Sequence, residues 1–391
     1  MSKIKKKRKI CVVTANRADF SRTETIIEAV RENSCLELQL VVFGSHLLRT
    51  TGRTIDEIRR KGFPIDRSFY MEIAGSNPTT MAKSVGLAMI ELSSIFDDLK
   101  PDIVLAPVDR FESLAIGATA ALMNIRVAHT QGGEVTGTID ESIRHALTKL
   151  SHLHFVATEK SRERVIRMGE HPKAVFNIGC PGTDLLLKAP PMNFGHTIEW
   201  LNKNLVKIDK KLNTTVPYVL MIQHPVTTEF YNTEQQILET LEAVTGLNKQ
   251  IIALWPNIDA GSDSIALALK KHPLVINGKI KIFTHIPTEI FSNVLRNASC
   301  IVGNSSSGIR ESCYFGTPTV NVGSRQSNRE RGSNVIDVGY NRIEIAQAVK
   351  KQIAHGAYPA EHIYGNGTAG RQFAKICATI ELPDIQKKIT Y

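Results

Sequence analysis

The chain has 391 residues, of which 42% are hydrophobic, 22% charged and 6% aromatic, a composition typical of an ordinary globular protein with room for two domains. No apolar stretch approaches the roughly 20 residues that a membrane helix needs, so we expect no membrane association. The net charge is +10, but six basic residues at positions 3–9 leave only +4 for the rest, and such a short basic run does not indicate a nucleic-acid partner.

Apolar runs alternate with helical patterns through the first half of the chain. Strands are predicted at residues 10–14, 38–43, 103–106, 126–128, 154–157 and 176–179, and helices at 21–33, 80–99 and 112–123. This alternation predicts a doubly wound parallel sheet.

Residues 186–217 interrupt the alternation with Pro190-Pro191 and a polar, lysine-rich stretch, where we expect the interdomain connection. A second series follows, with strands predicted at 218–222, 250–254, 280–283, 300–302 and 319–322 and helices at 233–247 and 343–353. We expect an α/β protein of GT-B architecture, with two Rossmann-like domains at 1–187 and 188–374. Residues 375–391 are expected to pack back on the N-terminal domain.

Residues 129–145 hold the densest group of ionisable side chains, directly after a predicted strand. They include Glu134, Asp140, Glu141 and Arg144. Ligands of α/β sheets bind beyond the carboxyl ends of the strands, so we interpret this segment as a catalytic edge. Asp109 follows the preceding strand. Neighbouring carboxylates suit proton abstraction from carbon, although each could instead form a salt bridge, for example to Arg110 or Arg144.

Residues 304–311 follow a predicted strand and are expected to open a helix whose N-terminus favours a phosphate. Ser305 and Ser306 would add hydroxyl donors, and Glu311 would accept hydrogen bonds from ribose hydroxyls. An ordinary helix cap is the alternative. Neither G-x-G-x-x-G nor a Walker A pattern occurs, which argues against NAD and ATP.

Other loops after predicted strands carry further candidates. His224 stands before a proline and could serve as an acid or a phosphate donor. The remaining candidate ligand contacts are Arg17, which could instead be solvated, Asn257, Asp259 and Ser262, which could instead cap a helix, and Ser21 and His285.

The six cysteines are scattered without a Cys-x-x-Cys pair, which indicates buried free thiols rather than a metal site or disulfides. The basic start is not followed by the apolar region of a signal peptide, so we expect a cytoplasmic protein.

Seven motifs, in this order, carry a resemblance to a known family: NRADFS, VDRFES, HTQGGEVTGTIDESIRHA, QHPVTT, PNIDAGS, GNSSSGIRE and FGTP. The chain resembles the hydrolysing UDP-N-acetylglucosamine 2-epimerases of sialic-acid pathways over nearly its whole length. The resemblance implies a UDP-sugar substrate, conversion of UDP-N-acetylglucosamine to N-acetylmannosamine and UDP, neither metal nor cofactor, and a homodimer or homotetramer.

Matched residue by residue, the resemblance implies that Asp109 and Asp140 are catalytic carboxylates and His224 a cleft histidine. Nucleotide contacts are implied for Arg17, Ser305, Ser306, Glu311 and Arg325, and we place Arg110, Glu141 and Arg144 among the substrate contacts.

Two departures from the family pattern flank the expected sugar site. Gln131 stands where the family often has glutamate, so we expect Glu134 or Asp140 to serve as the base. Pro107-Val108 replaces the His-Gly common before Asp109. Both changes could mark a different substrate, UDP-N,N'-diacetylbacillosamine. The competing hypotheses are a GT-B glycosyltransferase, a non-hydrolysing epimerase and a nucleotide-sugar-binding regulator without turnover.

Overall fold

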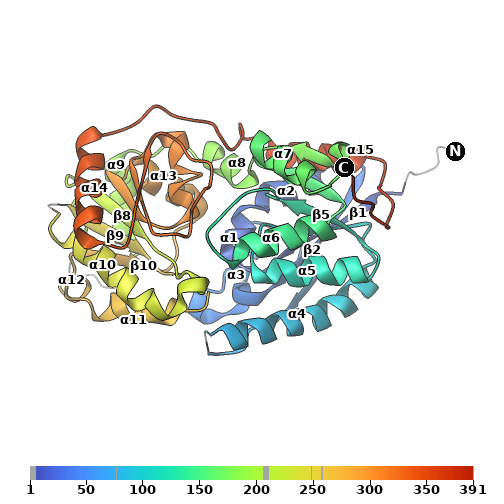
Figure 1. The fold of residues 1–391 in the computed structure, drawn as a ribbon, viewed down its shortest axis with the longest axis horizontal. Coiled ribbons are helices and arrows are strands. Elements are labelled where there is room, and N and C mark those ends of the chain that lie inside the picture. Colours follow the sequence, from blue (N-terminus) through green and yellow to red (C-terminus); the bar gives the residue numbers. More distant parts are fainter. Residues whose placement is uncertain (1–5, 76, 206–210, 248, 257–258, 391) are drawn as a thin grey trace.

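The computed structural model describes residues 6–75, 77–205, 211–247, 249–256 and 259–390. The first half of the chain forms a seven-stranded parallel sheet in the order β3-β2-β1-β4-β5-β6-β7, and Figure 1 shows it beside a second α/β unit. Its strands are β1 (Arg8–Thr14), β2 (Leu36–Phe43), β3 (Arg67–Phe69), β4 (Ile103–Ala106), β5 (Arg126–Thr130), β6 (Leu153–Val156) and β7 (Val175–Asn177).

Both faces of this sheet are buried, which explains why its strands read as continuous apolar runs. Along β1, Ile10 and Val12 belong to one core cluster, and Cys11 and Val13 to the cluster on the other face. The first cluster includes α2 (Glu24–Glu32), α3 (Ile55–Arg60) and α15 (Ala369–Thr379). The second includes α4 (Pro78–Leu99), α5 (Phe111–Leu122) and α6 (Ile139–Leu150). The short helix α1 (Arg17–Ser21) follows β1, and α7 (Glu159–Arg167) follows β6.

The second half forms a six-stranded parallel sheet in the order β10-β9-β8-β11-β12-β13. Its strands are β8 (Tyr218–Ile222), β9 (Gln250–Leu254), β10 (Ile280–Phe283), β11 (Cys300–Gly303), β12 (Thr319–Val322) and β13 (Val335–Val338). Its helices are α9 (Phe194–Lys203), α10 (Thr233–Thr245), α11 (Ser262–Lys271), α12 (Pro273–Ile276), α13 (Thr288–Arg296) and α14 (Arg342–His355). The two sheets confirm the predicted GT-B architecture.

The predicted helix at 21–33 is wrong at its start, because the chain turns between α1 and α2. The Thr23 hydroxyl donates to the Asp19 carbonyl at 3.0 Å, a local bond that competes with a continuous helix. The short strands β3 and β13 were not predicted. No helix in the described ranges has both the length and the apolar character needed to cross a membrane.

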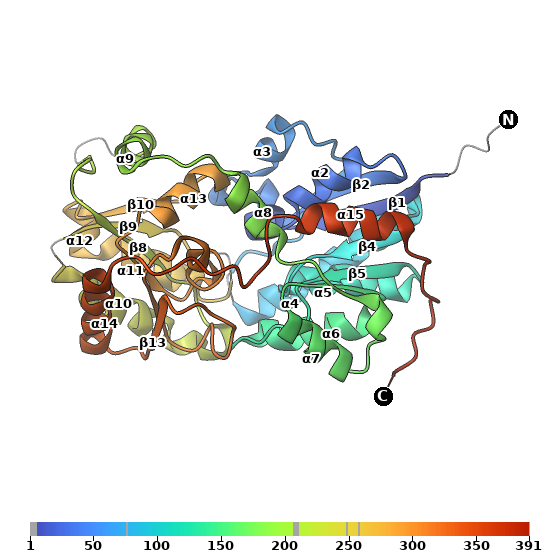
Figure 2. The ribbon, with the colours of Figure 1, turned by 90° about the horizontal axis from the view of Figure 1, so that it is seen from above.

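The chain crosses between the domains twice, as Figure 2 shows: once after α8 (Pro181–Lys188) and again ahead of α15. Helix α15 begins at Ala369, before the boundary suggested at residue 375, and packs against α2 in the N-terminal domain. The Asp184 carboxylate accepts the first N–H groups of α15, from Ala369 at 3.1 Å and Gly370 at 2.8 Å. A Cβ on Gly370 would lie 2.3 Å from the Thr25 carbonyl, so glycine permits this close packing.

Candidate functional site

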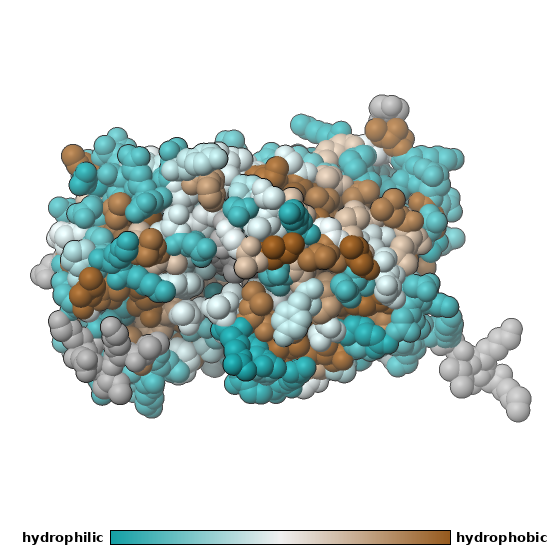
Figure 3. Space-filling view, turned by 90° about the horizontal axis from the view of Figure 1, so that it is seen from below, coloured by the Kyte–Doolittle hydropathy of each residue, from teal (hydrophilic) through white to brown (hydrophobic). Residues whose placement is uncertain are grey.

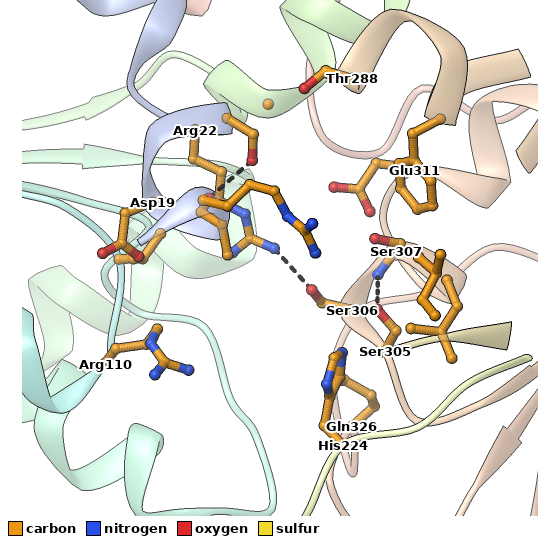
Figure 4. Close-up of a pocket in the computed structure, with 18 of the residues that line it drawn as sticks. Asp19, Arg22, Arg110, His224, Thr288, Ser305, Ser306, Ser307, Glu311 and Gln326 are labelled. Carbon is orange, nitrogen blue, oxygen red and sulfur yellow. Dashed lines mark hydrogen bonds between the residues drawn. The ribbon is translucent and has the colours of Figure 1, made fainter. Parts of the chain in front are cut away.

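A cleft lies between the carboxyl ends of the two sheets, and loops of both domains line it (Figure 4). The candidates that line it from the N-terminal domain are Arg17, Ser21, Asp109, Arg110 and Asp140. From the C-terminal domain they are His224, Ser305, Ser306, Glu311 and Arg325.

Other candidates lie behind or beside the cleft. Asp259 pairs with Arg110 at 2.7 Å, Oδ1 to Nη1, and this contact joins the two domains. Ser262 is buried at the first turn of α11. Glu141 accepts the Thr136 N–H at 2.6 Å instead of facing the cleft. Asn257 lies outside the described residues.

His285 links the two domains at the edge of the cleft. Its Nδ1 lies 2.8 Å from Arg17 Nη1, and its Nε2 lies 3.2 Å from a Glu57 carboxylate oxygen. Arg17 also donates to the Thr284 carbonyl at 3.0 Å. Arg17 therefore reaches the C-terminal domain, where it contacts the loop after β10.

Asp109 sits in a strongly cationic environment. It forms an ion pair with the fully buried Arg144, and Arg329 Nη2 lies 3.8 Å from the same carboxylate. Burial alone would raise the pKa of Asp109, but the charges of Arg144 and Arg329 outweigh burial and hold the pKa well below its usual range. Asp109 is therefore held ionised and exchanges protons poorly.

Asp140 has the opposite environment, although it lines the same cleft. It lies in the first turn of α6, where its N–H donates to the Thr138 hydroxyl at 3.3 Å. Burial, followed by the charge of Asp109, raises the pKa of Asp140 to about 6. A carboxyl group that titrates near neutral pH can accept a proton and return it.

His224 lies at the carboxyl end of β8, where its backbone is clamped by a side-chain amide. Asn304 accepts the His224 N–H at 2.7 Å and donates to its carbonyl at 2.9 Å. Burial, followed by the charges of nearby arginines including Arg325, lowers the pKa of His224 well below its usual value. The imidazole is therefore neutral and suited to hydrogen bonding rather than to proton donation near neutral pH.

Residues 304–311, here called the phosphate loop, do not open the helix that the sequence predicted. They form a 3₁₀ turn at Ser306–Gly308, and a second turn follows at Ser312–Phe315. The Ser305 hydroxyl accepts the Ser307 N–H at 3.3 Å, and such side-chain bonds compete with a helix. The helix-dipole argument is therefore wrong, and the serine hydroxyls and nearby arginines remain as candidate phosphate contacts.

Glu311 supplies an acceptor at this end of the cleft. Its carboxylate faces the cleft in Figure 4, and Oε2 is buried without a hydrogen-bond partner. A buried unsatisfied acceptor is costly. A ligand that brings hydroxyl groups to this position would satisfy it.

Sequence reasoning missed several residues that line the cleft. Arg22 donates to the Ser306 hydroxyl at 2.8 Å across the cleft (Figure 4). Arg329 contacts Asp109 and, through Nε at 3.4 Å, Glu134. Two signals could have identified them. Arg22 directly follows the NRADFS motif, and Arg329 lies in the loop after β12. The other missed lining residues include Asp19, Trp255, Phe291, Ser307 and Gln326.

Gln131 and Glu134 belong to residues 131–140, here called the catalytic loop, but neither lines the cleft. Gln131 is buried, and its Oε1 accepts from Arg22 at 3.2 Å and from Arg310 at 2.5 Å. Glu134 is also buried and forms ion pairs with Arg310 and Arg329. Of the two bases expected to replace the missing glutamate, the geometry therefore favours Asp140.

Val108, next to Asp109, has a φ of +52°, a region that a β-branched residue rarely enters. Its carbonyl accepts from His129 Nε2 at 2.6 Å, and its N–H donates to the Thr130 hydroxyl at 3.3 Å. Burial lowers the pKa of His129 to about 3, which keeps this imidazole neutral. These contacts hold the strained residue at the cleft wall.

The described residues contain no group of three or more histidine, cysteine, aspartate or glutamate side chains that could hold a metal ion.

Comparison with known proteins shows one family. The sequence model of the UDP-N-acetylglucosamine 2-epimerases matches residues 28–378. A hydrolyzing UDP-N,N'-diacetylbacillosamine 2-epimerase from Legionella pneumophila is 35% identical, covering 96% of this chain and 97% of its own. A UDP-N-acetylglucosamine 2-epimerase from Neisseria meningitidis is 33% identical over 94% of each chain. The solved structure of a Neisseria meningitidis UDP-GlcNAc 2-epimerase bound to UDP-GlcNAc has the same fold, with a TM-score of 0.75 at 16% identity, covering 94% of this chain and 99% of its own.

Proposed function

The chain belongs to the UDP-N-acetylglucosamine 2-epimerase family, and we propose that it is a hydrolysing member, which converts UDP-N-acetylglucosamine to N-acetylmannosamine and UDP for sialic-type acid biosynthesis. The observation that carries the proposal is the contrast between two carboxylates in one cleft. Asp140 titrates near neutral pH, whereas Asp109 is held ionised.

In the proposed reaction, Asp140 removes the proton from C2 of the sugar. The C2–H electron pair forms the C1=C2 double bond while the C1–O bond breaks, and UDP departs with the electron pair of the C1–O bond. Water then adds across the resulting 2-acetamidoglucal, with hydroxide bonding to C1 and a proton to the opposite face of C2. The ionised Asp109 stabilises positive charge that develops at C1 as UDP leaves.

The C-terminal side of the cleft fits the nucleotide portion. Ser305 and Ser306 offer hydroxyl donors to the diphosphate, and Arg325, together with Arg22 from the N-terminal domain, offers positive charge. The unsatisfied Glu311 oxygen fits the ribose hydroxyls. These groups support binding of UDP, and a glycosyltransferase would share them. The carboxylate pair favours the epimerase over that alternative, because a transferase does not remove the C2 proton.

A second candidate is the same reaction on UDP-N,N'-diacetylbacillosamine, and Val108 favours it. A β-branched residue at a φ of +52° is strained, and such strain is retained where it serves a site. Val108 is an apolar residue of a cleft wall that also includes Leu186 and Phe291. An apolar wall suits a sugar with a C6 methyl group better than one with a hydroxymethyl group.

The test is turnover of both UDP-sugars in D2O without an acceptor, followed by NMR. We expect free UDP and a 2-epimerised sugar with deuterium at C2. A product still joined to UDP would contradict hydrolysis, and turnover that requires an acceptor would indicate a transferase. The ratio of kcat/KM for the two sugars decides between the substrates.

We also propose a homodimer or homotetramer, with α4 in the contact between copies. Figure 3 shows hydrophobic side chains gathered on the face that carries this helix, where Leu87 and Ile90 are exposed. Antiparallel pairing of two copies would place Ile90 over Gly86, which has open space around it, and Lys83 near Glu91. Light scattering during size-exclusion chromatography measures the mass of the assembly. A monomeric wild-type protein whose mass Ile90→Lys leaves unchanged would contradict the proposed assembly.

All six cysteines are unpaired in the structure. Free thiols persist in reducing compartments, which supports the cytoplasm as the proposed location.

A further inference from the structure

Arg310 belongs to the phosphate loop, but its side chain is fully buried and does not line the cleft. The guanidinium crosses to the N-terminal domain, where it contacts Gln131 Oε1 at 2.5 Å, the Glu134 carboxylate and Cys180 Sγ at 3.5 Å. It also lies 5.4 Å from the centre of the Tyr364 ring. A buried cation needs such partners, and here the main ones are in the catalytic loop.

A second arginine, Arg144, links Glu134 to Asp109. The Glu134 carbonyl accepts from Arg144 Nη1 at 2.8 Å, and Nη2 of Arg144 pairs with Asp109. Both arginines are fully buried, so neither guanidinium can exchange these partners for water. The position of Arg310 therefore fixes Glu134, the Glu134 backbone fixes Arg144, and Arg144 fixes Asp109.

A second link joins the same two loops, but it passes through the cleft. Arg22 donates both to Gln131 Oε1 at 3.2 Å and to the Ser306 hydroxyl at 2.8 Å. A phosphate that binds at Ser306 competes for Arg22. Arg310, which lies outside the cleft, keeps its partners when such a ligand binds.

We propose that Arg310 is a positioning residue that couples the phosphate loop to the catalytic loop and acts on Asp109 through Glu134 and Arg144. The inference rests on the proposed function where it concerns turnover. The coupling between the loops is also measurable with UDP alone.

The activity experiment compares wild type with Arg310→Met, Arg310→Lys, Glu134→Gln and the double variant Arg310→Met/Glu134→Gln. Displacement of a catalytic group by about 1 Å costs about a hundredfold, so we expect kcat to fall at least about 30-fold in Arg310→Met while the Kd for UDP, from calorimetry, stays within about threefold. The lysine variant keeps the positive charge but lacks the planar guanidinium group, so its kcat should lie between those of Arg310→Met and wild type. The loss in the double variant should be far smaller than the product of the two single losses, because both changes break one chain of contacts.

Two readouts separate positioning from a merely structural role. Loss of Arg310 should raise the pKa of Asp109, because its ion pair with Arg144 loosens, and an NMR titration of the Asp109 carboxyl group should show this rise. Hydrogen exchange should show that UDP protects residues 131–140 in wild type but not in Arg310→Met. If the methionine variant does not fold, the lysine variant carries both measurements.

Additive losses, or UDP affinity that falls in parallel with kcat while the pKa of Asp109 is unchanged, would overturn the inference. Equal UDP-induced protection in wild type and Arg310→Met would also overturn it. A wild-type protein that binds UDP but turns over neither UDP-sugar would contradict the proposed function and leave the hydrogen-exchange test intact.

Discussion

Replacing Asp140 with asparagine should stabilise the protein and stop turnover at the same time. Burial and the charge of Asp109 raise the pKa of Asp140 from the ordinary 3.8 to about 6. A carboxyl group whose pKa is raised by folding destabilises the folded state wherever it is ionised. The cost is absent below pH 3.8, grows as the pH rises through the interval to about 6, and stays constant above it.

The difference between the ordinary pKa of 3.8 and the folded pKa of about 6 corresponds to a free-energy cost of about 3 kcal/mol at pH 7, at 1.36 kcal/mol for each pKa unit. Asp140 is only partly buried by accessible surface, so solvent screening lowers the expected gain in Asp140→Asn to about 1–2 kcal/mol. The amide cannot accept the C2 proton, so kcat should fall at least about a hundredfold.

Urea unfolding of both proteins at pH 7 and at pH 4 measures the gain, and release of free UDP measures kcat. Asp263→Asn is the matched control, because Asp263 is also the second residue of a helix but is exposed, and no gain is expected there. A gain of the same size at both pH values would refute the electrostatic argument. Near-normal kcat in Asp140→Asn would remove this residue from the mechanism.

Three further substitutions test the surroundings of the carboxylates. Arg144→Met removes the main cation beside Asp109 and should lower the free energy of unfolding by about 3–5 kcal/mol, because it leaves a buried charge without its partner. Since the pKa of Asp109 is depressed in the folded state, the difference in the free energy of unfolding between wild type and Arg144→Met depends on pH. Measured in urea, this difference should be complete above pH 3.8 and disappear as the pH falls through the lower folded pKa. Gly137→Ala would place a Cβ 2.0 Å from the Ser324 carbonyl, a distance too short for two non-bonded atoms. The two domains would have to separate at this contact, which should lower kcat/KM at least about tenfold. Gln131→Glu should leave the acid limb of the kcat profile in place, because two arginines contact the side-chain oxygen and would keep the new carboxylate ionised.

The controls for these substitutions come from the same chain. Gly246→Ala adds a methyl group where no atom lies within 4 Å and should not change kcat/KM. Equal effects of the two glycine substitutions would contradict the steric argument. A pH-independent loss of stability in Arg144→Met would show that packing rather than charge dominates there, and a new ionisation near neutral pH in Gln131→Glu would show that the arginines do not control this position.

The sequence alone predicted the architecture because it depends on local patterns. Strands buried on both faces read as apolar runs, and helices between them read as periodic segments, so the two parallel sheets followed from the order of the runs. The position of the cleft also followed, because the carboxyl ends of all strands in a parallel sheet lie at one edge. The motifs located the loops there, and Asp109, Asp140 and the serines of the phosphate loop all lie at the cleft.

Only the tertiary structure decided which members of these loops face the cleft and what charge they carry. Gln131, with a φ of +63°, turns away from the cleft, although Asp140 in the same loop faces it. The opposite pKa shifts of Asp109 and Asp140 depend on burial and on distant residues such as Arg329. Burial and long-range contacts arise only when segments far apart in the sequence pack together. A local pattern can therefore identify the carboxylates, but it cannot say which of them exchanges a proton.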